Sequence, residues 1–338
     1  MKLSLVTLAR GNDHGYAVIS QQLSYALADA GAELLEPWTF GHDLLVSFCL
    51  PNTFFLNGGK RRKDLIMHTM IEVEPTPPNW VPAMNACGAI WVPSQWVKER
   101  FQEDGVTVPI IVSGYGISPA VHHPVSNRVV NEGTLKVGVW GDSFGSRKRV
   151  LQAMECFIQA NLADAVCEIK VNARDIITPK RVVLNGETES RITIHNGSWP
   201  VGEMTNWLRS LDVLMYLSGG EGYGLMPLEA MACGVPVIGG LHTGMLEYMT
   251  EANTLHVPSD EMIEAPSYEY RFKEPAMMRS CDSNAVIHRL RWANDNRDAL
   301  LALGQKAASD VASLTWEKAG EEALARLREY RSAELLAA

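Results

Sequence analysis

Short apolar runs alternate with longer amphipathic stretches along most of this chain, and that alternation limits the folds it can adopt. In the first half, the pattern predicts strands at residues 3–8, 44–48, 65–68, 89–92 and 110–112, and helices at 19–30, 82–87 and 95–104. Strands that alternate with helices are typical of a parallel sheet, because each parallel connection needs a crossover segment. The first half therefore predicts an α/β domain.

The same pattern starts again after a polar segment, Asn127 to Gly133, which we interpret as a linker. It predicts strands at 136–140, 168–172, 192–195, 211–217 and 235–238, and helices at 148–160 and 201–210. We expect an α/β fold of two doubly wound, Rossmann-like domains, residues 1–128 and 129–315, with a last helix in residues 316–338. Ligands of such sheets bind beyond the carboxyl ends of the strands, so we expect the site in the cleft between the domains. The aperiodic segment 260–278 is predicted to be a surface loop.

Composition excludes several other classes of protein. The 338 residues are enough for two cores, and 46% hydrophobic and 20% charged residues are ordinary for a globular chain. The net charge of −9 disfavours nonspecific binding to nucleic acid or anionic lipid. The six cysteines form no C-x-x-C pair, which argues against a zinc site or a disulfide framework. With no signal peptide and no apolar run long enough to span a bilayer, we expect a cytoplasmic protein.

Residues 211–238 are the most informative part of the chain. The apolar run 211–217 is broken by Ser218-Gly219-Gly220, which favours a turn. Pro227 suits the first turn of a helix, and Gly234 with Pro236 ends that helix. This pattern predicts Glu229 in the first helical turn and Glu221 on the loop that precedes it.

The chemistry of this strand–loop–helix unit favours a nucleotide-sugar ligand. Backbone N–H groups around Tyr223 to Leu225, together with the positive end of the helix, are suited to bind phosphate. The two carboxylates, Glu221 and Glu229, are suited to accept hydrogen bonds from sugar hydroxyls. Taken singly, Glu229 could be a helix N-terminal acid and Glu221 a solvated loop residue, but their ordered combination favours the ligand site.

A basic cluster, Arg147-Lys148-Arg149, follows a glycine-containing turn and is predicted to open the helix 148–160. Cations at a helix N-terminus oppose the helix dipole, so their presence indicates another role. Neutralisation of a leaving diphosphate is the role that we infer for them.

The unit also resembles a known family. Glu221 and Glu229, with Gly222-Tyr223-Gly224-Leu225 between them and Ala230 to Ile238 behind, resemble the E-x7-E signature of the retaining glycosyltransferases of family 4, which have the GT-B fold. Further segments resemble the family in the expected order: 15–16, 67–72 with 77–80, 91–94, 114–117, 137–141 with 146–148, and 315–317. The resemblance implies that the last helix crosses back to the N-terminal domain.

The resemblance also implies the site residues. It gives catalytic roles to Glu221, Lys148, Arg147 and His68, and donor-binding roles to Glu229, Gly222, Tyr223, Gly224, Leu225, Gly15, Tyr16, Thr243 and Gly244. Glu229 would bind the ribose hydroxyls, Glu221 the transferred sugar, and Lys148 the diphosphate, with Arg147 as the neighbouring option. No metal and no cofactor beyond the nucleotide diphosphate sugar is expected. The chain departs from the family at Asp142, where many relatives carry arginine.

Our leading hypothesis is a retaining glycosyltransferase that works by front-face attack. One alternative is a catalytically silent nucleotide-sugar-binding subunit, and another is a transferase acting on a modified DNA base, with the basic loop Lys60 to Lys63 beside the cleft. An NAD-dependent oxidoreductase is disfavoured, because no strand is followed by G-x-G-x-x-G with the expected downstream acid. The sequence leaves open the donor sugar, the base, the oligomeric state and the acceptor, which could be a glycan, a lipid-linked sugar, a protein, a small metabolite or a modified nucleobase.

Overall fold

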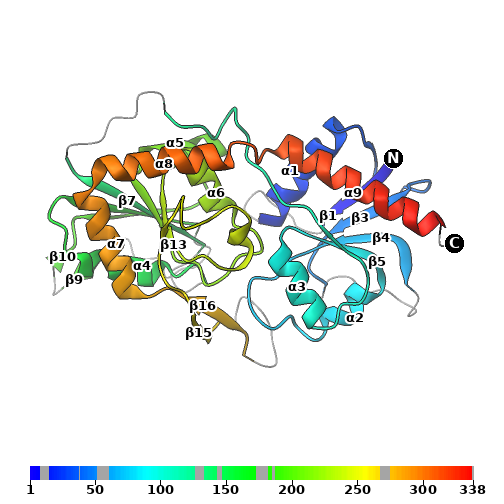
Figure 1. The fold of residues 1–338 in the computed structure, drawn as a ribbon, viewed down its shortest axis with the longest axis horizontal. Coiled ribbons are helices and arrows are strands. Elements are labelled where there is room, and N and C mark those ends of the chain that lie inside the picture. Colours follow the sequence, from blue (N-terminus) through cyan, green and yellow to red (C-terminus); the bar gives the residue numbers. More distant parts are fainter. Residues whose placement is uncertain are drawn as a thin grey trace. The chain divides into compact units, whose positions relative to one another are not determined.

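The computed structural model of the protein describes residues 1–7, 15–37, 39–51, 61–125, 133–142, 147–172, 182–184, 187–266 and 275–336 (Figure 1). The chain forms two compact units. Unit 1 comprises Met1–Gly116 and Ser313–Ala338, and unit 2 comprises Ile117–Ala312. Most of the segment predicted as a linker lies outside the described residues, so the boundary at residues 128 and 129 stays a prediction.

Unit 1 is built on a parallel six-stranded sheet in the order β2-β1-β3-β4-β5-β6. The strands are β1 Lys2–Thr7, β2 Glu33–Leu35, β3 Leu44–Phe48, β4 Arg62–His68, β5 Cys87–Val92 and β6 Ile110–Val112. The helices of this unit are α1 Gly15–Asp29, α2 Trp80–Asn85, α3 Gln95–Glu103 and α9 Trp316–Leu336. All residues of β3 and β5 are buried, as expected for inner strands of a parallel sheet.

The last helix, α9, belongs to unit 1, where it packs on α1. A Cβ on Gly320 would lie 2.4 Å from the carbonyl oxygen of Ala26, so glycine allows the two helices to approach closely. Tyr330 fixes the other end of the helix, because its hydroxyl donates to the carbonyl oxygen of Lys63 at 2.8 Å. Within the described ranges, no helix combines the length and the apolar character needed to cross a membrane.

Unit 2 has a second parallel six-stranded sheet, in the order β11-β8-β7-β12-β13-β14. Its strands are β7 Leu135–Gly141, β8 Ala165–Val171, β11 Ile192–Asn196, β12 Val213–Tyr216, β13 Val237–Gly239 and β14 Leu255–His256. The helices are α4 Val150–Ala160, α5 Val201–Ser210, α6 Leu225–Ala232, α7 Ser283–Asp295 and α8 Arg297–Val311, with a short 3-10 helix, η2 Thr243–Glu247. Two antiparallel ribbons complete the unit: β9 Val183–Leu184 with β10 Glu187–Thr188, and β15 Glu261–Glu264 with β16 Met277–Ser280.

These two sheets confirm the predicted α/β fold with two Rossmann-like domains. Some predictions within it were wrong. The segment 260–278 is not wholly a loop, because its ends form β15 and the first half of β16, which pair with each other. Arg147 and Lys148 do not open α4. Arg149 adopts a left-handed conformation (φ 57°) as the N-cap, so the helix begins only at Val150.

The strand–loop–helix segment that carries Glu221 and Glu229 differs from its prediction in one respect. Gly224 is the N-cap of α6 and is left-handed (φ 91°), a conformation that glycine adopts without steric cost. The helix therefore begins at Leu225, which makes Glu229 its fifth residue rather than a residue of the first turn. The carboxylate thus lies about one turn deeper along the helix than the sequence indicated.

Candidate functional site

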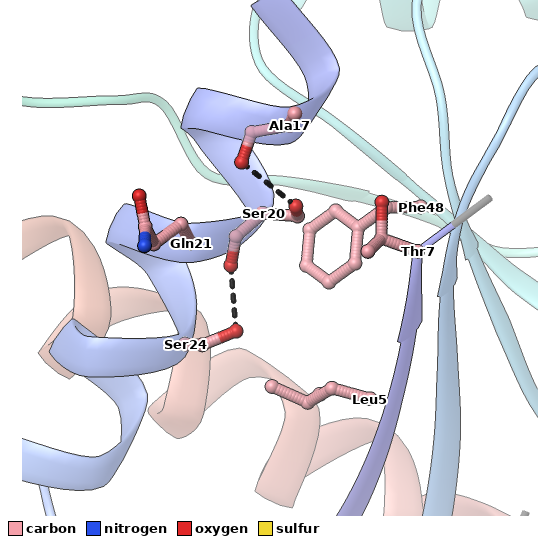
Figure 2. Close-up of a pocket in the computed structure, with 7 residues that line it drawn as sticks. All are labelled: Leu5, Thr7, Ala17, Ser20, Gln21, Ser24 and Phe48. Atoms are coloured by element: carbon pink, nitrogen blue, oxygen red, sulfur yellow. Dashed lines mark hydrogen bonds between the residues drawn. The ribbon is translucent and has the colours of Figure 1, made fainter. Parts of the chain in front are cut away.

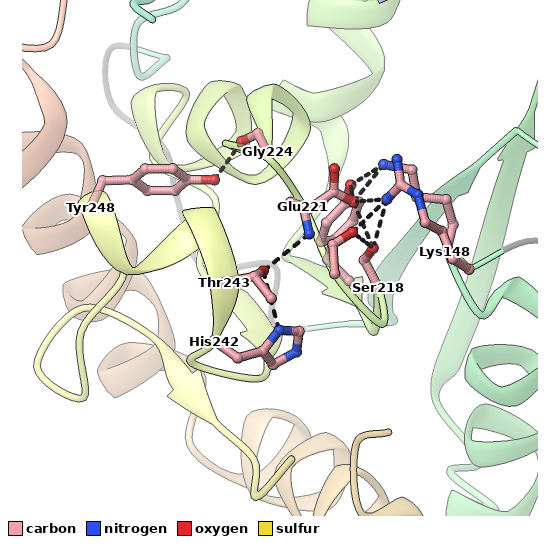
Figure 3. A network of polar contacts seen from close by, with 10 residues as sticks. Lys148, Ser218, Glu221, Gly224, His242, Thr243 and Tyr248 are labelled. Carbon is pink, nitrogen blue, oxygen red and sulfur yellow. Dashed lines mark hydrogen bonds and ion pairs between the residues drawn. The ribbon is translucent and has the colours of Figure 1, made fainter. Parts of the chain in front are cut away.

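A single carboxylate oxygen, Oε1 of Glu221, lies at the centre of the polar network in unit 2 (Figure 3). It accepts four hydrogen bonds: from Lys148 Nζ at 2.5 Å, Ser218 Oγ at 2.6 Å, Tyr216 Oη at 2.7 Å and Arg147 Nη1 at 2.9 Å. Within the described part of the chain, no donor reaches the other oxygen, Oε2. The network therefore fixes the orientation of Glu221 through one of its two oxygens.

The ammonium group of Lys148 is held from several sides. Besides its ion pair with Glu221, it donates to Tyr216 Oη at 2.9 Å. It also lies 5.1 Å from the ring centroid of Trp140 and 5.4 Å from that of Tyr216, distances typical of cation–π contacts. The side chain is only 8% exposed. Because a lysine has many rotamers, this enclosure fixes a group that would otherwise be mobile.

The electrostatics of the network keep Glu221 ionised. Burial raises the pKa of its carboxyl, but the charges of Arg147 and Lys148, with the hydrogen bonds from Lys148 and Ser218, outweigh burial and lower the pKa to about 2. Burial and the charge of Glu221 raise the pKa of Tyr216 well above its usual value. Tyr216 therefore stays a neutral hydrogen-bond donor to the carboxylate.

The loop carrying Glu221 is locked to the loop that follows β13. The Glu221 N–H donates to Thr243 Oγ1 at 3.0 Å, and the Gly244 N–H donates to the Glu221 carbonyl at 2.8 Å. A Cβ on Gly244 would lie 2.1 Å from the carbonyl oxygen of Gly222, so this position requires glycine. Thr243 is left-handed (φ 54°), an uncommon conformation for a β-branched residue. The structure thus brings the predicted residues Thr243 and Gly244 beside Glu221.

Glu229 lies further along α6, away from the cations that hold Glu221. Its side chain is 23% exposed, and its Oε1 lies 3.9 Å from Nε2 of His122, which is itself buried. Burial raises the pKa of Glu229 to about 7. The two acids of the unit therefore differ in charge state near neutral pH: Glu221 is ionised, whereas Glu229 is poised to take up or release a proton.

The other predicted residues of this loop are also close to Glu221. Tyr223 is buried with its ring centroid 5.6 Å from that of Tyr248, whose hydroxyl donates to the carbonyl oxygen of Gly224. Leu225 is the first residue of α6, so its N–H is one of those at the helix N-terminus that have no partner within the helix. Asp142, the departure from the family pattern, is exposed at the end of β7.

His68 lies in unit 1 at the end of β4 and has no solvent exposure. The ring centroids of Phe48 and Trp91 each lie 4.9 Å from that of His68, and its Nε2 lies 3.1 Å from Tyr115 Oη. Burial lowers the pKa of His68 to about 3, so the imidazole is neutral at physiological pH. A contact between His68 and a donor sugar stays a prediction.

Gly15 and Tyr16 open α1, also in unit 1. Nothing lies within 4 Å of a Cβ placed on Gly15 among the described residues, so packing against these residues does not require glycine there. The hydroxyl of Tyr16 lies 3.3 Å from Thr69 Oγ1 and accepts the Met70 N–H at 3.1 Å. Tyr16 therefore links α1 to the end of β4. Its predicted contact with a ligand stays a prediction.

A cavity of about 220 Å³ lies in unit 1 between α1 and strands β1 and β3 (Figure 2). Its lining carries no charged side chain: Leu5, Thr7, Ala17, Ser20, Gln21, Ser24 and Phe48. The hydroxyls of Ser20 and Ser24 donate to the carbonyls of Ala17 and Ser20 within α1, which leaves their oxygens as acceptors. This lining suits a small, uncharged, hydroxylated group.

Sequence reasoning missed three residues of the site: Tyr216, Ser218 and His122. Tyr216 was counted only as part of an apolar strand, and Ser218 only as a strand breaker. Their position carried the signal, because the carboxyl ends of parallel strands are where ligands of such sheets bind. His122 had no such signal, since it reaches Glu229 only through the fold of a distant segment.

Comparisons with known proteins point to one kind of enzyme. The model of a family described as "Family 4 Glycosyltransferase in conflict systems" matches residues 180–322. A curated relative, the lipopolysaccharide core biosynthesis mannosyltransferase LpsB of Rhizobium meliloti (strain 1021), is 40% identical over 68 residues. That match covers 18% of this chain and 19% of the relative, so the chain spans about a fifth of the relative's length.

Solved structures resemble the chain over nearly its whole length. Sucrose-phosphate synthase from Thermosynechococcus elongatus has a TM-score of 0.69 at 15% identity, covering 98% of this chain and 99% of that one. Anabaena Alr3699/HepE in complex with UDP and glucose has a TM-score of 0.69 at 12% identity, covering 97% and 99%. WaaG, a glycosyltransferase involved in lipopolysaccharide biosynthesis, has a TM-score of 0.65 at 13% identity, covering 95% and 98%.

At such low identity these structures show a shared fold, which is the GT-B fold. The family model covers both Glu221 and Glu229 and so adds a match in sequence to the likeness in fold. Residues 180–322 thus match a family 4 glycosyltransferase model in sequence, the chain as a whole has the GT-B fold, and together these findings support a glycosyltransferase of the family 4 type.

Proposed function

We propose that the protein transfers a sugar from a nucleotide diphosphate sugar to an acceptor hydroxyl with retention of configuration. One observation carries the proposal: Glu221 is anchored through Oε1 by Lys148 and Arg147, beside the N-terminus of the helix that carries Glu229. Cations for a diphosphate thus contact the strand–loop–helix unit that carries the carboxylates for sugar hydroxyls. HepE, which has the same fold, has been solved in complex with UDP-glucose. A UDP-sugar donor would be consistent with that complex.

In the proposed reaction, the bond between the anomeric carbon and the phosphate oxygen breaks, and the bond to the acceptor oxygen forms on the same face of the sugar. The acceptor proton passes to the departing phosphate oxygen. Lys148 and Arg147 would neutralise the charge that develops on this phosphate, with the N–H groups at the start of α6 as further donors. Oε2 of Glu221 would accept a hydrogen bond from the transferred sugar. The residues of this chain suffice for these roles, so we propose no protein-bound metal or further cofactor.

Glu229 would hold the ribose through its two hydroxyls. A carboxylate accepts two such hydrogen bonds only when it is ionised, because the protonated acid uses one oxygen as a donor. Because its pKa is raised to about 7, Glu229 must give up a proton before it can accept both hydroxyls below that pH. The cavity in unit 1, with its uncharged hydroxyl-rich lining, is the place where we expect part of a hydroxylated acceptor to bind.

Donor turnover followed by proton NMR tests the proposal. The protein is incubated with UDP-glucose, then with other sugar nucleotides including a mannosyl donor, without an acceptor so that water attacks the sugar. We expect slow release of the sugar with the anomeric configuration of the donor. Release of the opposite anomer first would contradict retention. Donor binding without turnover, with or without added glycan acceptors, would instead support a silent binding subunit, and absence of binding would contradict the nucleotide-sugar site.

Lys148→Ala and Glu229→Ala should abolish or strongly reduce this turnover. Lys306→Ala is the matched control in unit 2, because Lys306 forms an exposed ion pair with Asp310 along α8. Equal turnover in all three variants and the unaltered protein would mean that the signal comes from another site or from a contaminant.

A further inference from the structure

His122 is a buried histidine that faces Glu229 from a different part of unit 2. Its side chain is 7% exposed, and its Nε2 lies 3.9 Å from Oε1 of Glu229. This separation is too long for a hydrogen bond but short enough for a strong interaction between charges. Nδ1 of His122 is buried and has no hydrogen-bond partner among the described residues. The ring is therefore aimed at Glu229 without being committed to another partner at either nitrogen.

The backbone around His122 is fixed on both sides. The His122 N–H donates to the carbonyl oxygen of Ser118 at 2.7 Å. Arg209 of α5 donates to the carbonyl oxygens of Val121 and His123, at 2.5 Å and 3.1 Å. These bonds flank His122 directly, so its Cα cannot shift far from α6. Only rotation of the side chain is left to close the distance to Glu229.

Few other titratable groups face this pair. Arg209 and His123 lie beside His122, and together with burial, which is the main cause, they lower its pKa to about 4. Tyr248 faces Glu229, but its hydroxyl is occupied in donating to the Gly224 carbonyl. No other residue of α6 is charged. With the pKa of Glu229 raised to about 7, both members of the pair are neutral near pH 6.

We infer that His122 is a positioning residue that accepts the proton of Glu229 when ribose hydroxyls bind. The proton leaves Oε1 of Glu229 and bonds to Nε2 of His122, so the total charge of the pair does not change. Ionised Glu229 can then accept both ribose hydroxyls, and the imidazolium N–H holds the carboxylate in place. This inference rests on the proposed function, in which Glu229 binds the ribose.

The magnitude of the interaction allows this transfer. At 3.9 Å, with the effective dielectric constant of about 20 that suits partly buried pairs, a negative Glu229 strengthens proton binding at His122 about a thousandfold. This gain is similar in size to the difference between the pKa of Glu229, about 7, and that of His122, about 4. Release of the proton to solvent is the competing path, and at pH 6 the transfer to His122 is favoured once Glu229 has ionised.

Calorimetric titration at pH 6.0, in buffers with different ionisation enthalpies, measures the protons released on binding. The probe is UDP-glucose, whose diphosphate does not titrate near this pH, or whichever sugar nucleotide of the NMR panel binds. The unaltered protein should release close to no protons. His122→Phe keeps a buried ring but cannot accept a proton, so it should release close to one proton and bind about tenfold more weakly. His288→Phe is the matched control, since His288 is exposed on α7 and is not among the groups that shift the pKa of His122, and it should behave like the unaltered protein.

Equal proton release by the unaltered protein and by His122→Phe would overturn the inference. A failure of the proposed function would look different: Glu229→Gln would then bind the probe as tightly as the unaltered protein, or nothing would bind at all. If His122→Phe does not fold, nitrogen NMR of the histidine-labelled unaltered protein replaces it. The Nε2 resonance of His122 should move to the imidazolium position on addition of the probe at pH 6.0, and an unchanged neutral resonance would overturn the inference.

Discussion

Lys148 Nζ lies 2.5 Å from Oε1 of Glu221, and both side chains are more than nine-tenths buried. Arg147 joins the same oxygen at 2.9 Å, so two cations meet at one carboxylate oxygen. In the proposed function, a bound diphosphate would interact with both cations. Since the lysine is already fixed before a ligand arrives, little of its conformational entropy is left to lose on binding.

Replacing Lys148 by methionine tests its role in stabilising the leaving group. The methionine side chain preserves much of the volume but removes the charge aimed at the phosphate. We expect donor turnover to fall by about 10²–10³-fold, the range for loss of one preorganised donor. Steady-state kinetics with the donor found by NMR would measure this. A fall of less than threefold would contradict a role for Lys148 at the reacting phosphate.

Tyr216→Phe tests the hydroxyl that bridges Lys148 and Glu221. Its removal leaves two buried charged groups with one fewer partner each, which should lower the free energy of unfolding by about 1–2 kcal/mol. Turnover should fall while donor affinity changes little, because the hydroxyl orients groups rather than binding the donor. Urea unfolding and kinetics check the two effects. Tyr25→Phe, at a tyrosine that is 59% exposed, is the neutral control.

Glu221→Gln should destabilise the protein in a pH-dependent way. The folded pKa of Glu221, about 2, lies below its ordinary value of 4.5, so ionisation of this residue stabilises the fold above pH 4.5. That contribution is lost as the pH falls from 4.5 towards 2. We expect the variant to be less stable than the unaltered protein by on the order of 1–3 kcal/mol at pH 7, with the gap narrowing at pH 3.5. A gap independent of pH would show that the carboxylate is not stabilised by its cations.

Glu229→Gln should have the opposite effect on stability. Its folded pKa, about 7, lies above 4.5, so the fold loses stability as the pH rises through this interval and the partly buried acid ionises. The glutamine variant avoids this cost and should be more stable by on the order of 2 kcal/mol above pH 7, with no gain below pH 4.5. Thermal unfolding across this range is the measurement. At each pH, the stability of the variant is compared with that of the unaltered protein. If the variant gains less at pH 8 than at pH 4.5, the raised pKa is contradicted.

Much of the fold could be predicted because inner strands of a parallel sheet are continuous apolar runs. The run at Leu44–Phe48 matches the inner strand β3 at both ends. Two of the edge strands were missed: β2 is only Glu33–Leu35 and is largely exposed, and β14 is only two residues long. Such short strands form because a neighbouring strand supplies the hydrogen-bond partners. The local sequence does not indicate that pairing, so these strands could not be predicted from it.

The candidate site could be predicted only in part, for a similar reason. Glu221 and Glu229 were recognisable because both belong to one local unit. The partner of Glu229, His122, lies 107 positions earlier in the chain, and Arg209 positions it from a third segment. The start of α4 was also unpredictable, because the left-handed backbone of Arg149 is a non-glycine conformation that the basic sequence does not indicate.

A crystal structure of the protein with its sugar nucleotide tests the central claim most directly. We predict that the carboxylate of Glu229 accepts hydrogen bonds from the ribose hydroxyls, that Lys148 and Arg147 contact the diphosphate, and that Oε2 of Glu221 contacts the sugar. A nucleotide bound elsewhere, with the network around Glu221 Oε1 unchanged and no contact to Glu229, would contradict it.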